Sequence, residues 1–224
     1  YKIALSRKHR FTTDAVLLYN FSKAAKPKRL CDLCSGTGII ALLHNFKSDN
    51  PPAFSLCVEI DDEAVFLLGE TLEINKSSNI EIFHGDLRLA PPSQFDCSFD
   101  TVTCNPPYFK ENSGLTGESI NARQEIMCNI EDVCSAASKL LKYGGRFFVC
   151  QRPERLVDLL CAMRKFGIEP KSMRTAYYSP DKSPFLVLAE GKKGGKSGFK
   201  IKPDLFITKN GEYTEEYRSM AGME

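Results

Sequence analysis

Short apolar runs alternate along this chain with longer stretches in which apolar residues recur every three or four positions. The first pattern is typical of strands and the second of helices. Strands are predicted at 29–33, 54–59, 80–83, 98–104, 146–151, 172–178 and 185–190. Helices are predicted at 39–45, 61–75, 130–142 and 154–165, with Gly144 and Gly145 ending the third. Because strands and helices alternate over most of the chain, the pattern predicts a parallel sheet.

The order of the elements predicts an α/β fold of the Rossmann-like, doubly wound type. The run 54–59 is almost wholly apolar, as a strand covered on both faces should be. Only a short turn at 179–182 joins the last two strands, which predicts an antiparallel hairpin. We therefore expect a seven-stranded sheet, mostly parallel with an antiparallel C-terminal edge hairpin, in a single domain covering residues 1–224.

Composition places the chain among ordinary globular proteins, with 42% hydrophobic and 26% charged residues. No apolar run approaches the roughly 20 residues that span a bilayer, so no membrane association is expected. Nine cysteines lie mostly inside apolar runs, which favours reduced, buried thiols and a cytoplasmic location. Cys31 and Cys34 form a C-x-x-C pair, but nothing completes a metal-binding set, so no metal is expected.

Charge is distributed unevenly along the chain. Residues 1–138 carry a net charge of −5, whereas residues 139–209 contain 16 Lys and Arg against 6 Asp and Glu, a net charge of +10. A basic segment of this kind indicates a polyanionic partner, here nucleic acid, although a solvated lysine-rich surface is the plain alternative. Residues 191–198 are rich in Gly and Lys, and 191–224 are predicted to form a basic, flexible tail.

A glycine turn follows the first predicted strand. Gly36 and Gly38 fit the pattern G-x-G-x-x-G/A, and Glu59 ends the second strand 21 residues after Gly38, where a carboxylate can bind ribose hydroxyls. Asp32, four residues before Gly36, suits a cofactor with a positive amino group better than a pyrophosphate. The turn alone does not separate a dinucleotide from another adenosine cofactor, and such turns also simply pack a helix on a strand.

A rigid corner follows the fourth predicted strand. In Asn105-Pro106-Pro107-Tyr108, two prolines fix two φ angles and remove two N–H donors. The remaining acceptors, the Asn105 side-chain oxygen and the Pro106 carbonyl, can take both N–H bonds of an amino group on a flat ring, and Tyr108 offers a stacking face. An ordinary strand-ending turn is the alternative.

These motifs resemble the ordered signatures of class I S-adenosylmethionine-dependent methyltransferases that methylate amino groups. The resemblance uses the segments 32–38, 59–61, 85–86 and 105–108. With 10–18, 144–146 and 152–155, the chain resembles the bacterial tRNA1(Val) (adenine37-N6)-methyltransferase family from about Arg10 to Tyr213. It departs from the family pattern at 183–185, near a turn of the edge hairpin.

The resemblance implies S-adenosyl-L-methionine as the cofactor and assigns residues to it. Asp32 would bind the methionine amino group, Glu59 the ribose hydroxyls and Asp86 the adenine amino group, with Leu87 against the ring. The methionine part would be lined by Ser35, Gly36 and Gly38. The segment 1–28 would cap the pocket through Phe11, Thr13 and Asp14.

The resemblance also implies catalysis at Asn105 and Pro106, which would accept the two N–H bonds of adenine N6. Tyr108 would stack on a base flipped out of tRNA. Further RNA contacts would come from Pro107, Phe109, Arg152 and Arg155, the loop 109–125, and other cations of the basic segment. A monomer is expected.

Other functions remain open on the sequence. A protein glutamine-N5 methyltransferase would share the cofactor site, but only 31 residues precede Asp32, too few for the helical domain that such enzymes carry. A guanine-N2 RNA methyltransferase is a second alternative. A nicotinamide-dependent oxidoreductase would leave the 105–108 corner unexplained, and a non-enzymatic RNA-binding protein would leave the cofactor motifs unexplained.

Overall fold

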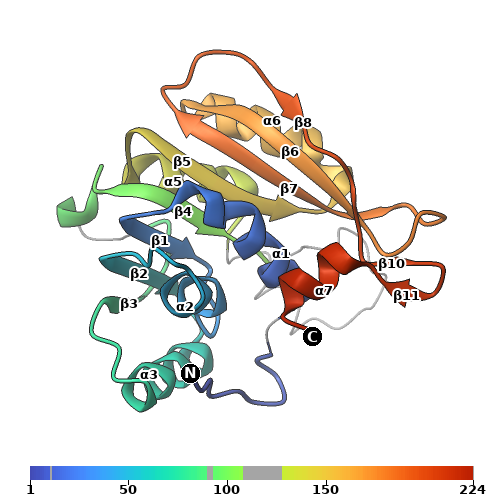
Figure 1. The fold of residues 1–224 in the computed structure, drawn as a ribbon. Coiled ribbons are helices and arrows are strands. Elements are labelled where there is room, and N and C mark those ends of the chain that lie inside the picture. The colour runs from blue at the N-terminus through green and yellow to red at the C-terminus, as the bar shows by residue number, and fades with distance from the viewer. Residues whose placement is uncertain (11, 90–92, 108–127, 224) are drawn as a thin grey trace, which may run out of the picture.

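A computed structural model describes residues 1–10, 12–89, 93–107 and 128–223. Its main sheet has the strand order β3-β2-β1-β4-β5-β7-β6, and only β7 runs antiparallel to its neighbours (Figure 1). The strands are β1 (Arg29–Leu33), β2 (Phe54–Glu59), β3 (Ile80–His84), β4 (Phe99–Cys104), β5 (Leu141–Gln151), β6 (Ile168–Tyr177) and β7 (Pro184–Lys193). The predicted Rossmann-like fold is confirmed, including the antiparallel hairpin of β6 and β7.

Helices cover both faces of this sheet. They are α1 (Thr13–Ser22), α2 (Ile39–Phe46), α3 (Asp62–Ile74), α5 (Ile130–Leu140), α6 (Leu156–Lys165) and α7 (Glu215–Ala221). One core packs α1 and α2 on β5–β7, and a second packs α5 and α6 on the opposite face of β1, β2, β4 and β5. Single helical turns occur at η1 (Lys23–Ala25), η2 (Ser93–Phe95) and η3 (Pro153–Arg155).

Strands β1, β2 and β4 are buried between these two layers. From Leu30 to Leu33 and from Ser55 to Glu59, every residue of β1 and β2 is buried. Parallel strands in the middle of a doubly covered sheet need mainly apolar side chains on both faces, which explains why most residues of β1 and β2 are apolar. Their carboxyl ends therefore meet at one edge of the sheet, where α/β folds bind ligands.

Strand β5 begins earlier than predicted. The glycines 144 and 145 were expected to end a helix over 130–142, but α5 ends at Leu140 and β5 starts at Leu141. The register shifts between Phe99 and Thr101 of β4, which pair with Leu141 and Arg146. Gly144, with φ +79°, lets β5 bulge at this point, so the glycines mark an irregular strand rather than a helix end.

The segment predicted as a tail contains further elements. Strands β8 (Lys200–Ile201) and β9 (Leu205–Phe206) pair with β6 beyond the predicted seven strands, and β10 (Thr208–Lys209) pairs with β11 (Glu212–Tyr213). Helix α7 lies beside α1 (Figure 1), and the Asn20 side chain donates to the Met220 carbonyl. The segment therefore differs from the flexible tail predicted for 191–224, because its strands pair with β6 and its helix α7 packs beside α1.

Candidate active site

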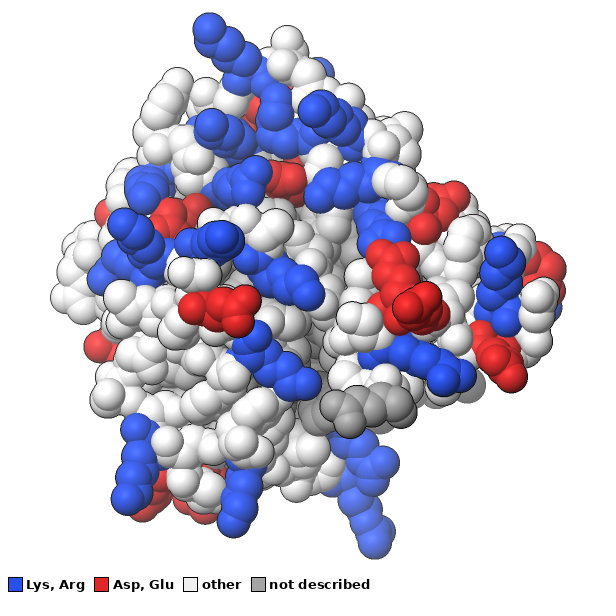
Figure 2. All heavy atoms as spheres, viewed as in Figure 1, with Lys and Arg blue, Asp and Glu red and all other residues white. Residues whose placement is uncertain are grey.

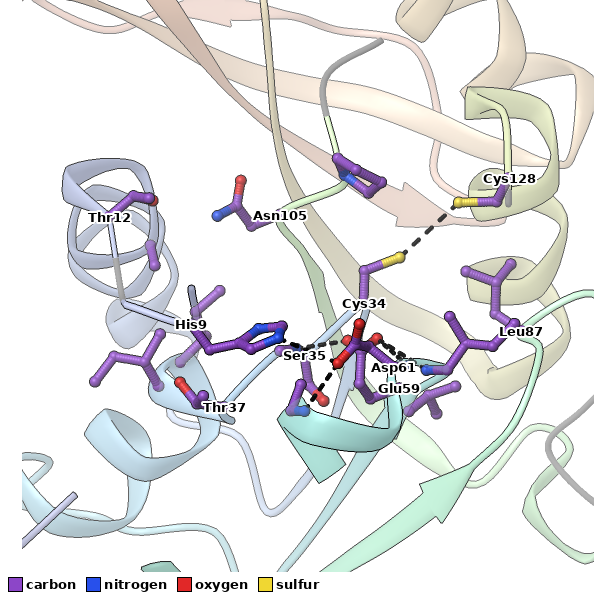
Figure 3. A pocket seen from close by; sticks show the side chains of 18 of the residues that line it. His9, Thr12, Cys34, Ser35, Thr37, Glu59, Asp61, Leu87, Asn105 and Cys128 are labelled. Atoms are coloured by element: carbon purple, nitrogen blue, oxygen red, sulfur yellow. Dashed lines mark hydrogen bonds and ion pairs between the residues drawn. The ribbon is translucent and has the colours of Figure 1, made fainter. Parts of the chain in front are cut away.

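A cavity of about 300 Å³ opens at the carboxyl ends of β1, β2 and β4 (Figure 3). Of the residues assigned from sequence, seven line it: Ser35, Gly36, Glu59, Asp86, Leu87, Asn105 and Pro107. Seven others do not: Asp32, Gly38, Pro106, Thr13, Asp14, Arg152 and Arg155. Phe11, Tyr108, Phe109 and the loop 109–125 lie outside the described residues. The volume is in the range of small-molecule sites.

The turn after β1 places backbone against this cavity. Gly36 and Gly38 have φ of +54° and +74°, a region that favours glycine. A Cβ on Gly38 would lie 2.6 Å from Leu68 Cδ1 of α3, so this position also needs the absence of a side chain. Helix α2 begins directly afterwards at Ile39, and its first N–H groups suit a negatively charged ligand group.

Glu59 joins the end of β2 to the glycine turn. Its Oε2 accepts from the Gly36 N–H at 2.7 Å, and its Oε1 accepts from the N–H groups of Ile60 and Asp61, each at 2.9 Å. A carboxylate oxygen has two lone pairs, so Oε1 is filled and Oε2 keeps one. In this rotamer, Glu59 can accept one ribose hydroxyl, and accepting both would require the side chain to turn.

Asp32 is a buried carboxyl group at the carboxyl end of β1. The Thr103 hydroxyl donates to Oδ1 at 2.6 Å, while Oδ2 has no hydrogen-bond partner within the described part of the protein. Burial raises the pKa of Asp32 to about 7, although the Thr103 hydroxyl opposes this. An unpartnered buried carboxylate is costly unless a positive group pairs with it, but Asp32 does not line the cavity, so a ligand ammonium could pair with it only through an intervening water.

Asp86 and Leu87 follow β3 and form another wall of the cavity. The Arg88 guanidinium makes an ion pair with Asp86, and its hydrogen bonds hold the pKa of that carboxyl below its usual range. Leu87 is buried and packs on the core beneath. The side chain of Asp86 is therefore oriented by its neighbour two residues away, which the sequence did not indicate.

Asn105 directly follows β4 and precedes Pro106 and Pro107, the two residues of the Pro-Pro corner. The buried Cys150 thiol of β5 donates to Asn105 Oδ1 at an S···O distance of 3.1 Å. Pro106 is buried and Pro107 is exposed. Sequence reasoning assigned Cys150 only to the core, because a contact across two strands leaves no local signal.

The N-terminal segment also reaches the cavity, through neighbours of the predicted Thr13 and Asp14. His9, Arg10, Thr12 and Ala15 line it, whereas Thr13 and Asp14 sit in the first turn of α1. His9 Nε2 lies 3.2 Å from Asp61 Oδ1 at the start of α3 (Figure 3). These contacts join positions about fifty residues apart, so a local sequence pattern could not reveal them.

Three cysteines meet at one side of the cavity. Cys34 Sγ lies 4.0 Å from Cys128 Sγ, and both residues line the wall (Figure 3), while Cys104 is buried beside Cys34. Hydrogen bonding between the thiols raises the pKa values of Cys34 and Cys128, and burial raises that of Cys104 to about 11. These thiols stay protonated near pH 7.

Among the described residues, no group of three or more His, Cys, Asp or Glu side chains could hold a metal ion.

The basic segment, residues 139–209, contributes cations to the surface of the molecule. On the face shown in Figure 2, Lys and Arg gather over the part of the molecule that contains β5, β6, β7 and β8. Several of these cations have partners: Arg152 donates to the Phe185 carbonyl, and Arg155 contacts Asp158 at 2.8 Å. No helix in the described ranges is long and apolar enough to cross a membrane.

Comparison with known proteins gives consistent matches. Residues 6–163 match the family model described as "Methyltransferase small domain". A curated relative from Histophilus somni (strain 129Pt), named tRNA1(Val) (adenine(37)-N6)-methyltransferase, is 28% identical over 213 residues, which cover 93% of this chain and 86% of the relative. A relative of the same name from Bacteroides fragilis (strain YCH46) is 30% identical over 139 residues, covering 61% of this chain and 57% of the relative.

Solved structures support the same fold. A predicted O-methyltransferase, protein Atu636 from Agrobacterium tumefaciens, superposes with a TM-score of 0.74 at 20% identity, covering 94% of this chain and 96% of that one. TrmN from Thermus thermophilus gives 0.58 at 21% identity, with 80% of this chain and 48% of that chain covered. At these identities the likeness concerns the fold alone.

Proposed function

Since this chain belongs to the methyltransferase small domain family and is an S-adenosylmethionine-dependent methyltransferase, we propose that it methylates the N6 amino group of an adenine in tRNA. The expected target is adenine 37 of a valine tRNA, the nucleotide named for its relatives from Histophilus somni and Bacteroides fragilis. A monomer acting in the cytoplasm, where tRNA is processed, is part of the proposal.

The observation that carries this proposal is the corner at the end of β4. Asn105 lines the same cavity as Glu59 and Asp86, so a base whose amino group reaches Asn105 also reaches the cofactor side. The Cys150 thiol donates to Asn105 Oδ1 and helps to hold this amide at the corner, and Asn105 Oδ1 is the first acceptor that we assign to the substrate amino group. The Pro106 carbonyl is the second acceptor that the corner offers.

The chemistry of an aromatic amine explains why two acceptors matter. The lone pair on adenine N6 is delocalised into the ring, so the nitrogen is a poor nucleophile. Accepting both N–H bonds favours a pyramidal nitrogen, and these bonds strengthen as positive charge develops, which favours the transition state. A strong base is not required, because the proton can leave after the new N–C bond has formed.

The cavity fits S-adenosyl-L-methionine on the chemistry of its donors. When bound, this cofactor supplies a methyl group activated by a sulfonium. We assign Asp32, whose Oδ2 has no hydrogen-bond partner among the described residues, to the ammonium group through water, since Asp32 itself does not line the cavity. Glu59 would accept a ribose hydroxyl through its remaining Oε2 lone pair, and Asp86 and Leu87 would hold the adenine. Ser35, Gly36 and the start of α2 would face the methionine part.

The substrate must present an unpaired or flipped adenine, because a stacked base cannot enter a cavity of this kind. The surface over β5 and β6 suits an RNA backbone, with Arg152 and Arg155 following β5 at the carboxyl edge. These contacts would position the RNA, while the cavity selects the base.

The test is identification of the product nucleoside. The protein is incubated with isotopically labelled methyl donor and total bacterial tRNA, and the RNA is digested to nucleosides for mass spectrometry. We expect N6-methyladenosine, and mapping on purified valine tRNA should place it at position 37. Label in N2-methylguanosine, or only in protein glutamine, would contradict the proposal and select one of the two alternative amino substrates.

A further inference from the structure

We propose that Tyr178 and Phe185 form a stacking platform for an unpaired RNA base that flanks the methylated one. This inference rests on the proposed function, because it names a further contact of the same RNA. The stacking platform comprises these two aromatic side chains at the β6–β7 hairpin, on the carboxyl side of the sheet and outside the cavity.

The two rings are already arranged as a stack. Their centroids are 4.1 Å apart, the rings lie at 22° to each other, and Tyr178 is 56% exposed. Thr208 donates to the Tyr178 carbonyl through its N–H and its hydroxyl, each at 2.8 Å. Arg152 donates to the Phe185 carbonyl at 2.9 Å. The rings therefore sit on fixed backbone, so little conformational entropy would be lost when a base stacks on them.

The sheet register places this platform within reach of the corner at Asn105. Cys150, which contacts Asn105, pairs with Leu188 of β7, and Phe185 precedes Leu188 by three residues. Two strand spacings of about 4.8 Å and three residues of about 3.3 Å give a separation of roughly 14 Å. A few extended nucleotides bridge such a distance, so an RNA loop with one base in the cavity can lay a neighbouring base on Tyr178.

The chemistry around the platform favours single-stranded RNA over an apolar partner. Exposed aromatic rings beside cations are how proteins bind unpaired bases, because every base has a π face and every nucleotide a negative charge. Arg152 adjoins Phe185, and Lys182 lies in the connecting turn. The surrounding segment 139–209 carries a net charge of +10, which complements a phosphate backbone and would repel a basic peptide.

The main test compares two exposed tyrosines at opposite edges of the sheet. Tyr143, 81% exposed near the start of β5, is the matched control for Tyr178. The RNA is a stem-loop that contains the target adenine in its unpaired loop. We expect Tyr178→Ala to raise Kd for this RNA about 5- to 150-fold, the range for loss of one base–aromatic stack. Tyr178→Phe and Tyr143→Ala should bind like the wild type, and S-adenosylmethionine binding by Tyr178→Ala should be unchanged.

A fluorescence experiment reports the stack directly. The chain contains no Trp, so Tyr178→Trp introduces a single indole at the platform and Tyr143→Trp a control indole at the opposite edge. We expect the stem-loop to quench the emission of Tyr178→Trp and not that of Tyr143→Trp. A stem-loop with an abasic site next to the target adenine should quench less, and a fully paired duplex should not quench.

The outcomes separate this inference from the proposed function. If the wild type methylates RNA while Tyr178→Ala binds it as tightly and Tyr178→Trp shows no quenching, the platform is overturned and the proposed function stands. If the wild type neither binds nor methylates RNA, the proposed function fails and the platform fails with it. Thermal unfolding of Tyr178→Ala serves as the folding control, and the conservative Tyr178→Phe variant keeps the test valid if the alanine variant unfolds.

Discussion

The sheet has two halves, one around β1, β2 and β4 and the other around β5, β6 and β7. Both place functional groups at the carboxyl edge of the sheet, but the chemistry of these groups differs. Around β1, β2 and β4, the groups at the edge are backbone turns and shielded carboxyls, such as the Gly36 N–H held by Glu59 and the buried Asp32. Around β5, β6 and β7, they include the exposed ring of Tyr178 and the half-buried cation Arg152. Charge follows this division, since residues 1–138 are net acidic and 139–209 are net basic.

This contrast shows how one fold separates two binding tasks. Groups fixed by burial can recognise a small molecule of constant shape, and each of them matters greatly because nothing nearby replaces it. Exposed side chains recognise a long, flexible polyanion through many weak contacts, and each can be lost at modest cost. We therefore expect substitutions at the junction and in the first half to have larger effects than those in the second.

The largest effect is expected at Asn105, where the two halves meet. Asn105→Ala removes an acceptor that strengthens its bond only in the transition state, so kcat should fall by about 10²- to 10³-fold. Calorimetry should show S-adenosylmethionine affinity within about twofold of the wild type, or roughly 0.4 kcal/mol. An equal loss of affinity and rate would instead mean that the corner supports the fold or the cofactor.

The next effect concerns the glycine turn. Gly38→Ala would place a Cβ against Leu68 in a left-handed backbone conformation, and we expect a loss of about 3 kcal/mol in the free energy of unfolding. Urea titration measures it. Gly69→Ala is the control, because Gly69 lies inside α3 with open space around its Cα. Alanine there should raise the free energy of unfolding by about 0.5–1 kcal/mol. Unchanged stability of Gly38→Ala would contradict the packing described here.

Asp32 should make stability depend on pH. Its native pKa of about 7 lies above the ordinary value of 3.8, so the native state holds a proton that the unfolded state has lost. The contribution of this proton to the free energy of unfolding is complete below about pH 4 and is lost as the pH rises towards 7. Asp32→Asn should remove this dependence and stabilise the ligand-free protein at pH 8 by about 2 kcal/mol, measured by urea titration.

The same variant tests the ammonium site. An ionised Asp32 pairs with a positive group, so wild-type affinity for S-adenosylmethionine should rise between pH 6 and 8. Asp32→Asn should bind about tenfold more weakly at pH 8, a loss of about 1.4 kcal/mol, with little pH dependence over this range. Equal affinities at pH 8 would remove Asp32 from the cofactor site.

The smallest effect is expected from the surface cations. Reversing Arg152 and Arg155 to Glu should weaken RNA binding about tenfold near physiological salt. It should also flatten the plot of log K against log salt by at least about 1.4, since each lost phosphate contact on a single strand contributes about 0.7. Arg164 and Lys165, at the far end of α6, are the matched control pair. Equal slopes for both double variants would show that the arginine pair makes no special contact.

The sequence predicted the centre of the fold well because burial there leaves a plain pattern. Strands β1 and β2 lie between two helical layers and are mostly apolar, and the glycine turn and Pro-Pro corner follow strands β1 and β4. Helix α1 was not predicted, because the fold buries it on several sides, including Leu17, Leu18 and Phe21, and an amphipathic stripe is absent. Helix α7 depends on α1 for its partner, which no local pattern specifies.

The candidate site was predictable only where its parts follow a motif. Ser35, Gly36, Glu59 and Asn105 line the cavity as expected. His9 and Cys150 reach the site through contacts with Asp61 and Asn105 that fold distant segments together. Glycines 144 and 145 misled the prediction because the same residues that end helices also permit strand bulges, and only the partner strand decides between them.

The thiols in the cavity wall have a consequence for how the enzyme keeps its donor. An electrophilic methyl group held near a thiolate would alkylate it, since thiolate sulfur is a better nucleophile than an aromatic amine. Hydrogen bonding between thiols raises the pKa values of Cys34 and Cys128, and burial raises that of Cys104, so all three stay in the thiol form, which is a poor nucleophile. The cavity wall can therefore contain closely packed cysteine thiols, and the enzyme does not inactivate itself by methylating them.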